Sequence, residues 1–289
     1  MVLVSATGFG TLAIFAKFGY GAGLGTEQTL AFRFGLAAIG MWALAIAIGQ
    51  NPARLSPRRL AVFFALGGVV YTGQSLTYFI ALRSLPASMV VLIAYIYPSL
   101  VVLAGWLFLR RRVSIWHGVA LGASFLGVAL LVGGAHFQLA WALVFAVASP
   151  TIYTGYILIG ERVMSSSPAV AASAVIMSGA ALAFCCLAAF EHQLAVPRNP
   201  TGWAVAVGIA LFPTMLAISL FMAGLPRVGA ARAALISTWE PVVTVGLAVA
   251  LLGDRLSLLQ IAGGILVLVA VIVVQAAQLW SLGPPNALK

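Results

Sequence analysis

Ten long apolar runs follow one another along the chain, and short polar connections separate them. Each run has about 20 residues, the length that an α-helix needs to cross the hydrocarbon core of a bilayer. The runs are continuously apolar and lack the apolar–polar alternation of transmembrane β-strands. The pattern therefore predicts an all-α integral membrane protein with ten transmembrane helices, near residues 1–21, 28–49, 58–82, 87–109, 114–133, 139–160, 168–190, 200–224, 229–252 and 257–280.

Turn-forming and basic residues occupy the predicted connections. Asn51-Pro52 and Ser56-Pro57 lie in the second connection, Leu85-Pro86 in the third and Arg110-Arg111-Arg112 in the fourth. Such residues are typical of the ends of helices. The first run lacks a basic leader, so we interpret it as a retained helix rather than a cleaved signal peptide.

The composition supports the membrane class. The chain has 289 residues, of which 63% are hydrophobic and only 7% charged, and its mean hydropathy is +1.13. A soluble domain has about 25% charged residues, and a disordered chain is poorer in apolar residues. Ten helices of about 20 residues use most of the chain, so we expect no soluble domain.

The net charge of +10 comes from short basic clusters between the apolar runs. We interpret these clusters as determinants of membrane orientation, and we expect no nucleic-acid partner because no basic stripe is present. Ten spans place both termini on one side. Ten basic residues fall on that side and predict cytoplasmic termini: Arg54, Arg58, Arg59, Arg110, Arg111, Arg112, Arg162, Arg227, Arg232 and Lys289. Five fall on the opposite side: Lys17, Arg33, Arg83, Arg198 and Arg255.

A repeat at a fixed offset of 143 residues relates the two halves of the chain. Several less common residues recur at this offset: Pro57 and Pro200, Pro98 and Pro241, Arg112 and Arg255, and Ser114 and Ser257. Each half holds an odd number of spans, so the second half would insert upside down, as in many secondary transporters. We predict two inverted five-helix repeats, residues 1–138 and 139–289, around a central cavity; similar helix lengths alone are the alternative explanation.

Residues suited to metal or covalent chemistry are sparse. Cys185 and Cys186 are adjacent within one apolar run, and His117, His136 and His192 show no ligand spacing. These patterns match no disulfide framework or metal motif. We expect no cofactor, no metal and no catalytic residue.

Pro98 and Pro241 lie near the middle of the fourth and ninth predicted spans. A proline within a helix leaves the carbonyl four residues earlier without its donor, which here frees the carbonyls of Ala94 and Ser237. Broken backbone at membrane depth is tolerated where it faces protein or a watery cavity. The two prolines are therefore candidate hinges at a shared central site, while simple helix bending is the alternative.

Glu240 precedes the second proline and is the one acid clearly within a predicted span. An ionisable group at this depth is costly and is functional by default. Glu240 is therefore a candidate proton carrier or an anchor for a substrate ammonium group; a structural hydrogen bond to a neighbouring helix is the alternative.

Other polar and aromatic residues fall on helix faces that could meet at the same place. Tyr71, Gln74 and Tyr78 share one face of the third span by their spacing, and Ser237 and Glu240 share one face of the ninth. Deep rings do not act as interfacial anchors. The candidate substrate-binding residues are Gln74, Tyr78, Tyr95, Tyr97, Tyr153, Ser237, Trp239 and Glu240. Such a cavity suits a small zwitterion better than a sugar phosphate, for which we would expect intramembrane Lys and Arg.

Small residues mark possible helix contacts. Gly118 and Gly122 form a GxxxG motif in the fifth span, and Gly263-Gly264 lies in the tenth. Such faces permit close helix packing. We expect packing within the chain and a functional monomer, with a homodimer as the alternative.

Four motifs carry a resemblance to a known family: Tyr95-Ile96-Tyr97-Pro98-Ser99-Leu100, Trp239-Glu240-Pro241, Leu252-Gly253-Asp254-Arg255, and Gln260 followed by Ile261-Ala262-Gly263-Gly264. With them the chain resembles the drug/metabolite transporter superfamily, specifically the EamA-type exporters with ten helices in two inverted halves. In many relatives the position of Asp254 is Glu. The resemblance covers essentially the whole chain.

Within that superfamily the fourth span resembles that of the bacterial aromatic amino-acid exporters, and Tyr153 matches a tyrosine of their sixth helix. This resemblance implies a cavity for amino acids, aromatic ones included, and export across the inner membrane. Those exporters have a neutral residue at the position of Glu240, so proton-coupled export and facilitated export down a gradient both stay open.

Together these features predict an inner-membrane secondary transporter that exports amino acids or related small amphipathic metabolites by alternating access. Its expected partners are the small-molecule substrate and membrane lipid. A multidrug or toxic-compound exporter of the same fold is the first alternative. A channel and an intramembrane enzyme are the others; the enzyme has little support, because one acid without a nearby second group is a poor catalytic set.

Overall fold

The computed structural model describes residues 1–111, 113–133, 140–164, 167–193 and 195–281; Arg112, His136, Lys289 and the predicted repeat boundary at 138/139 lie outside them. The described residues form helices and connections, with no β-strand among them. Ten of their helical segments are long and apolar enough to cross a membrane: Val2–Gly21, Thr26–Ala47, Pro57–Ser84, Ala87–Leu109, Ile115–Gly133, Ala140–Val163, Ala169–Phe190, Pro200–Val228, Arg232–Leu252 and Leu258–Ala277. The prediction of an all-helical ten-span protein is confirmed.

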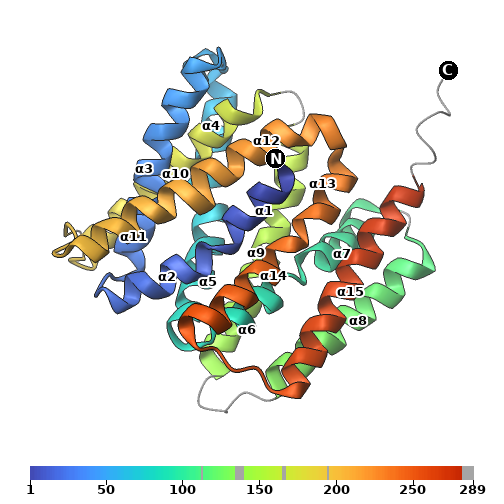
Figure 1. Cartoon of the computed structure of the whole chain (residues 1–289). Helices are drawn as coiled ribbons and strands as arrows, with labels where there is room; N and C mark the ends of the chain where they lie inside the picture. Colours follow the sequence, from blue (N-terminus) through green and yellow to red (C-terminus); the bar gives the residue numbers. More distant parts are fainter. Residues whose placement is uncertain (112, 134–139, 165–166, 194, 282–289) are drawn as a thin grey trace.

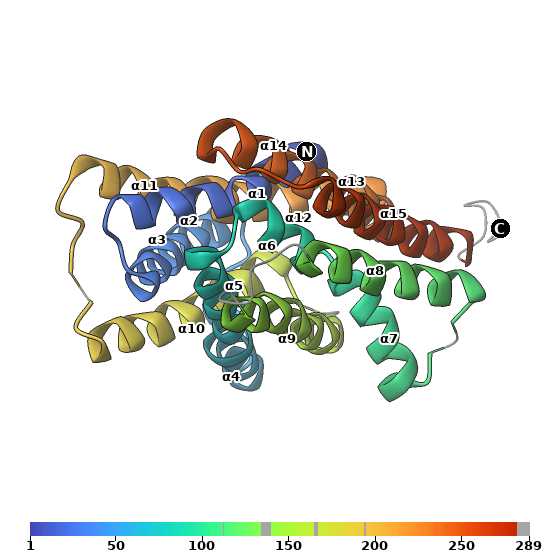
Figure 2. The ribbon, with the colours of Figure 1, turned by 90° about the horizontal axis from the view of Figure 1, so that it is seen from below.

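Five of the spans are single helices that run without interruption. They are α3 (Thr26–Ala47), α8 (Ile115–Gly133), α9 (Ala140–Met164), α10 (Ala169–Phe190) and α15 (Leu258–Ser281). Among them α3 packs along α10, and α8 packs along α15 (Figures 1 and 2). In both pairs a helix from the first half of the chain lies beside one from the second half.

The other five spans are interrupted. They consist of α1 (Val2–Gly10) and α2 (Leu12–Gly21); α4 (Pro57–Ala65), η2 (Leu66–Tyr71) and α5 (Thr72–Ser84); α6 (Ala87–Ala94) and α7 (Tyr97–Leu109); α11 (Pro200–Ala210), η4 (Leu211–Leu216) and α12 (Ala217–Val228); and α13 (Ala230–Ser237), α14 (Trp239–Leu247) and η5 (Ala248–Leu252). A short 3₁₀ turn, η1 (Pro52–Arg54), lies in the connection before α4.

The third and eighth spans each contain a π-helical segment, η2 and η4. A π-helix leaves a carbonyl without its usual donor, and here a threonine hydroxyl replaces that donor. Thr72 Oγ1 donates to the carbonyl of Gly67 at 2.9 Å, and Thr214 Oγ1 donates to that of Ile209 at 2.8 Å. In both cases the carbonyl lies five residues earlier. Single π-turns of this kind are frequent at functional sites.

The main apolar core lies where α3, α6 and α10 meet their neighbours. The rings of Phe34 on α3 and Phe184 on α10 stack with centroids 5.5 Å apart. Trp42 Nε1 also donates to Ser178 Oγ at 3.0 Å across the same pair of helices. Residues Ala87–Ile93 of α6 are buried along the whole helix, so the first half of the fourth span is held firmly in the bundle.

The contact between α8 and α15 depends on glycines other than those of the predicted GxxxG motif. A Cβ atom on Gly127 would lie 2.8 Å from the carbonyl oxygen of Gly263, whereas one on Gly118 or Gly122 would meet nothing within 4 Å. The expectation for Gly263 is therefore correct, and that for Gly118 and Gly122 is wrong. The rotation of α8 about its axis brings Gly127 rather than the motif to the helix contact.

Candidate functional site

The fourth and ninth spans are both interrupted near mid-membrane, at positions 143 residues apart. Tyr95 follows the last residue of α6, and Thr238 follows the last residue of α13. The helices that continue each span carry Pro98 and Pro241 in their first turns. At 1.5 Å per residue, each interruption lies about 12 Å from the nearer end counted along its span. The two prolines thus begin new helices instead of bending continuous ones.

A proline does not interrupt every span of this protein. Pro150 lies within α9, which continues through it as one helix. Proline removes one backbone donor, but neighbouring groups decide whether the helix then ends. In the ninth span the freed carbonyl of Ser237 accepts a hydrogen bond from another helix, the phenol of Tyr95, at 2.7 Å. The interruptions near Pro98 and Pro241 therefore occur where the fourth and ninth spans contact each other.

The phenol of Tyr95 also contacts the candidate acid. Its hydroxyl lies 3.0 Å from a carboxylate oxygen of Glu240. One hydroxyl at the end of α6 therefore faces both the freed carbonyl of the ninth span and its acid, and its single proton is shared between these two acceptors. Tyr95 is buried, while Glu240 and Ser237 are half-buried. These three predicted site residues are brought together across the two halves of the chain.

Aromatic rings extend from Tyr95 as a continuous row of edge and stacking contacts. Tyr95 contacts Tyr97 with centroids 6.0 Å apart, and Tyr97 contacts Tyr153 at 5.0 Å. The row then continues through Tyr156 and Tyr71 to Phe34. We call these five tyrosines the tyrosine row: Tyr71, Tyr95, Tyr97, Tyr153 and Tyr156. Aromatic contacts of this geometry are favourable, so each ring helps to hold the next.

The tyrosine row keeps part of its surface free of protein contact. Tyr71, Tyr97, Tyr153 and Tyr156 are half-buried although they lie deep within their spans. Beside them Gln74 Nε2 donates to Ser149 Oγ at 3.1 Å, and this hydrogen bond joins α5 to α9. The helical spacing of Tyr71 and Gln74 along the third span thus correctly indicated that they share one face. The third, fourth and sixth spans together form the surface that carries the tyrosine row.

Two predicted site residues lie at the margin of this cluster. Tyr78 is buried and its ring contacts the neighbouring Phe79 rather than the tyrosine row. Trp239 is 43% exposed, and its Nε1 donates to Thr7 Oγ1 on α1 at 3.2 Å. The direction of a single side chain on a helix depends on the helix's rotation, which spacing along one span does not specify.

Arg33 lies deeper than an orientation determinant at a helix end. The charge count places it on the side opposite the termini, within the predicted span 28–49, and in the structure it lies in α3 and is only 3% exposed. It is about 10 Å from the start of that span at 1.5 Å per residue. Its Nε donates to Thr214 Oγ1 at 3.0 Å, and its guanidinium lies 4.6 Å from the ring centroid of Phe34. The sequence signal for this position was a basic residue five positions after the start of the predicted run 28–49.

At the end of the bundle opposite Met1, contacts between the halves hold the connections together. The carboxylate of Asp254 accepts hydrogen bonds from the backbone N–H and the hydroxyl of Ser88, at 3.0 and 2.7 Å. Ser88 lies in the first turn of α6, where the helix dipole stabilises a negative charge such as the carboxylate of Asp254. Asp254 therefore holds the start of α6, the helix that Tyr95 follows.

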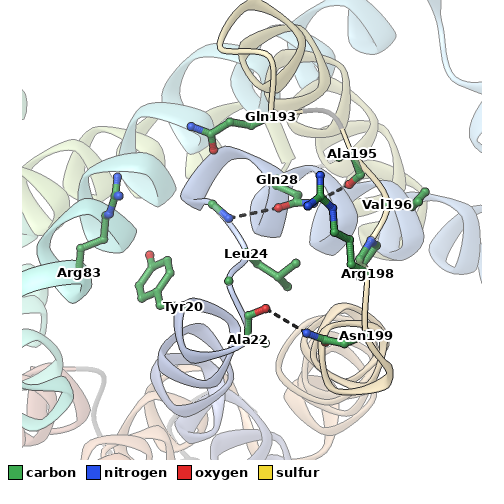
Figure 3. Close-up of a pocket in the computed structure, with 13 residues that line it drawn as sticks. Tyr20, Ala22, Leu24, Gln28, Arg83, Gln193, Ala195, Val196, Arg198 and Asn199 are labelled. Carbon is green, nitrogen blue, oxygen red and sulfur yellow. Dashed lines mark hydrogen bonds between the residues drawn. The ribbon is translucent and has the colours of Figure 1, made fainter.

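A cavity of about 690 Å³ lies at the same end (Figure 3). The connection between α2 and α3 and the connection between α10 and α11 form its walls. Gln28 donates to the carbonyl of Ala195, and Asn199 donates to that of Ala22. None of the predicted site residues lines this cavity. It is an open vestibule near Arg83 and Arg198 and is separate from the tyrosine row.

The described chain is thus a multi-pass helical membrane protein with an acid between paired mid-span interruptions, an arrangement typical of secondary transporters. It belongs to the EamA-like transporter family, whose model matches residues 1–133 and again residues 140–275. The resemblance to the EamA-type family is therefore confirmed. Membership of this family indicates a membrane transporter rather than an enzyme.

Two relatives extend the comparison. The uncharacterized transporter YcbK of Bacillus subtilis (strain 168) is 24% identical over 273 residues, which cover 91% of this chain and 87% of that protein. A solved crystal structure with 21% identity has a TM-score of 0.67 and covers 98% of both chains. The second similarity shows a shared fold over nearly the full length.

Proposed function

We propose that this protein is a bacterial inner-membrane secondary transporter that exports amino acids, aromatic ones included, or related small amphipathic metabolites by alternating access. The observation that carries the proposal is the contact between Tyr95 and Glu240 at the paired interruptions. Irregular backbone at membrane depth occurs where it lines a cavity, and transporter substrate sites lie at such discontinuous helices.

The acid and the row of rings suit different parts of one substrate. Glu240 can accept hydrogen bonds from an ammonium group, since a carboxylate is an acceptor. The tyrosine row offers faces and edges for an aromatic or aliphatic side chain and hydroxyls for polar groups. The resemblance to aromatic amino-acid exporters rests on Tyr95, Tyr97 and Tyr153, and these three belong to the row.

A sugar phosphate would need an intramembrane Arg or Lys to balance its charge. Arg33 is such a residue. A phosphate ester carries close to two negative charges near neutral pH, and one guanidinium among rings and hydroxyls balances only part of that charge. A carboxylate, with one negative charge, remains the better match.

The proposed orientation places both termini in the cytoplasm. Arg54, Arg58 and Arg59 lie at the end of the bundle that holds Met1, as do Arg110 and Arg111 in the connection after α7. Removing Arg33 from the opposite side strengthens the imbalance that favours this orientation. The export direction then runs from the end near Met1 toward the end with the vestibule.

We also propose that the transporter functions as a monomer without a cofactor. The helix pairs α3–α10 and α8–α15 join the two halves within one chain. A homodimer through the open Gly118 and Gly122 face is the alternative, and cysteine cross-linking at these two positions in native membranes distinguishes the two.

The decisive experiment is efflux from liposomes that contain the purified protein and a panel of labelled amino acids, with and without a pH gradient. We expect saturable efflux of aromatic and branched amino acids, and a clear loss in Glu240→Gln at equal protein level. A higher efflux rate with the pH gradient identifies proton-coupled export. Equal efflux rates with and without the gradient identify facilitated export. Efflux of toxic organic cations but no amino acid would favour the multidrug alternative.

A further inference from the structure

Arg33 carries a fixed positive charge into the interior of the bundle. Arginine does not lose its proton in proteins, so its burial cannot be relieved by neutralisation. An intramembrane charge of this kind marks a functional site by default. Within the described residues Arg33 forms no ion pair with a carboxylate.

Rings and hydroxyls surround the guanidinium in place of an acid. Its carbon lies 4.6 Å from the ring centroid of Phe34 and 5.9 Å from that of Phe79, and Nε donates to Thr214. The ring of Phe79 in turn contacts that of Tyr78, with centroids 6.2 Å apart. Cation–π contacts and neutral hydrogen bonds stabilise a guanidinium, but they leave its net charge uncompensated.

This charge lies next to the proposed site. Tyr71 is a member of the tyrosine row, and Phe34 contacts its ring at 5.5 Å. At the other end of the tyrosine row the hydroxyl of Tyr95 lies 3.0 Å from the carboxylate of Glu240. Two opposite charges thus border the same group of phenols, while no ion pair joins them to each other. The field between them favours a substrate that itself carries both signs of charge.

We propose that Arg33 determines substrate specificity by attracting the carboxylate of the substrate toward the phenols of Tyr71 and Tyr78, opposite the ammonium group at Glu240. This inference rests on the proposed function and adds to it a requirement for an anionic group. Simple organic cations, which lack that group, are then poor substrates.

Three matched compounds test the requirement in liposomes that contain the full-length protein: phenylalanine, phenethylamine without the carboxylate, and 3-phenylpropionate without the amine. Rates are corrected for leakage from protein-free vesicles. We expect wild type to prefer phenylalanine to phenethylamine. Arg33→Gln should lower phenylalanine efflux by roughly tenfold or more and leave phenethylamine efflux unchanged.

Two further variants separate charge from structure. Arg33→Lys retains the charge and Thr214→Val removes only the hydrogen bond, so both should keep the preference for phenylalanine. An equal fall of both substrates in Arg33→Gln, or the same loss of preference in Thr214→Val, would show a purely structural link and overturn the proposal. If Arg33→Gln does not fold, loss of the preference in a stable Arg33→Lys protein overturns it equally.

The wild-type rates distinguish this inference from the proposed function. Efflux of 3-phenylpropionate but not phenylalanine, abolished in Arg33→Gln, supports the role of Arg33 and rejects amino-acid export. Efflux of phenylalanine and phenethylamine at equal rates supports amino-acid export and rejects the role of Arg33. Efflux of phenethylamine alone, or of none of the three, rejects both.

Discussion

The hydroxyl of Tyr95 lies 3.0 Å from the carboxylate of Glu240, and this contact joins the interruption of the fourth span to that of the ninth. The two residues are 145 positions apart in the chain. The same hydroxyl lies 2.7 Å from the carbonyl oxygen of Ser237, so a movement of α6 against the ninth span changes both distances. The contact therefore couples the position of the acid to the relative position of the two halves.

Tyr95→Phe removes this coupling and keeps the ring. We expect a loss of about 1 kcal/mol in unfolding free energy, the usual contribution of a hydrogen bond, and a several-fold lower efflux rate. Thermal unfolding in detergent and liposome efflux measure the two effects. Tyr20→Phe, which removes a hydroxyl that donates to the carbonyl of Phe79, is the control; equal effects on efflux from both variants would contradict a special role for Tyr95.

Tyr97→Ala should reduce transport of large substrates more than that of small ones. Tyr97 links Tyr95 to Tyr153 in the tyrosine row, so its removal takes away a ring contact that only a large side chain can use. Efflux of phenylalanine and alanine gives the ratio. Trp239→Ala removes an even larger aromatic residue outside the row and should change both rates alike. The same ratio in the two variants would place the row outside the substrate path.

Asp254→Ala should destabilise α6 at its first turn. The N–H and hydroxyl of Ser88 lose their acceptor, and the loss of such a cap costs about 1–2 kcal/mol. The unfolding temperature of the purified protein measures this effect. Arg255→Ala, at the exposed neighbouring residue, is the control and should be neutral. An unchanged unfolding temperature in Asp254→Ala would mean that water replaces the carboxylate without cost.

Gly127→Ala should weaken the packing of α8 on α15. The added Cβ would lie 2.7–3.0 Å from atoms of Gly263 and Val267, and overpacking of this kind costs about 1–3 kcal/mol. Gly118→Ala, where a Cβ meets nothing within 4 Å, should leave the unfolding temperature unchanged. If Gly118→Ala is the more harmful change in membranes, the open face is covered by another chain and the homodimer alternative gains support.

The spans themselves could be predicted closely from the sequence, because the bilayer imposes a local requirement of length and apolarity on each helix. The sequence also marked Pro98 and Pro241 as candidate breaks, since proline removes its own backbone donor, but the continuous helix around Pro150 shows that the surroundings decide whether a break forms. The break near Thr11 and the π-segments η2 and η4 were not predicted, because the threonines that donate to their carbonyls do not stand out in the apolar pattern. Thr214, for example, donates to the carbonyl of Ile209 in α11 and also accepts a hydrogen bond from Arg33.

The sequence by itself therefore determined the membrane class, the ten spans, the scarcity of charge and the singular acid Glu240. Only the tertiary structure decided which side chains meet. Helix rotation and pairing placed Tyr95 against Glu240, turned Trp239 toward α1 and enclosed Arg33 among rings. The physical reason is that an apolar helix is equally soluble in lipid on all its faces. Which face turns toward the other helices is therefore specified by packing between segments that are distant in the sequence.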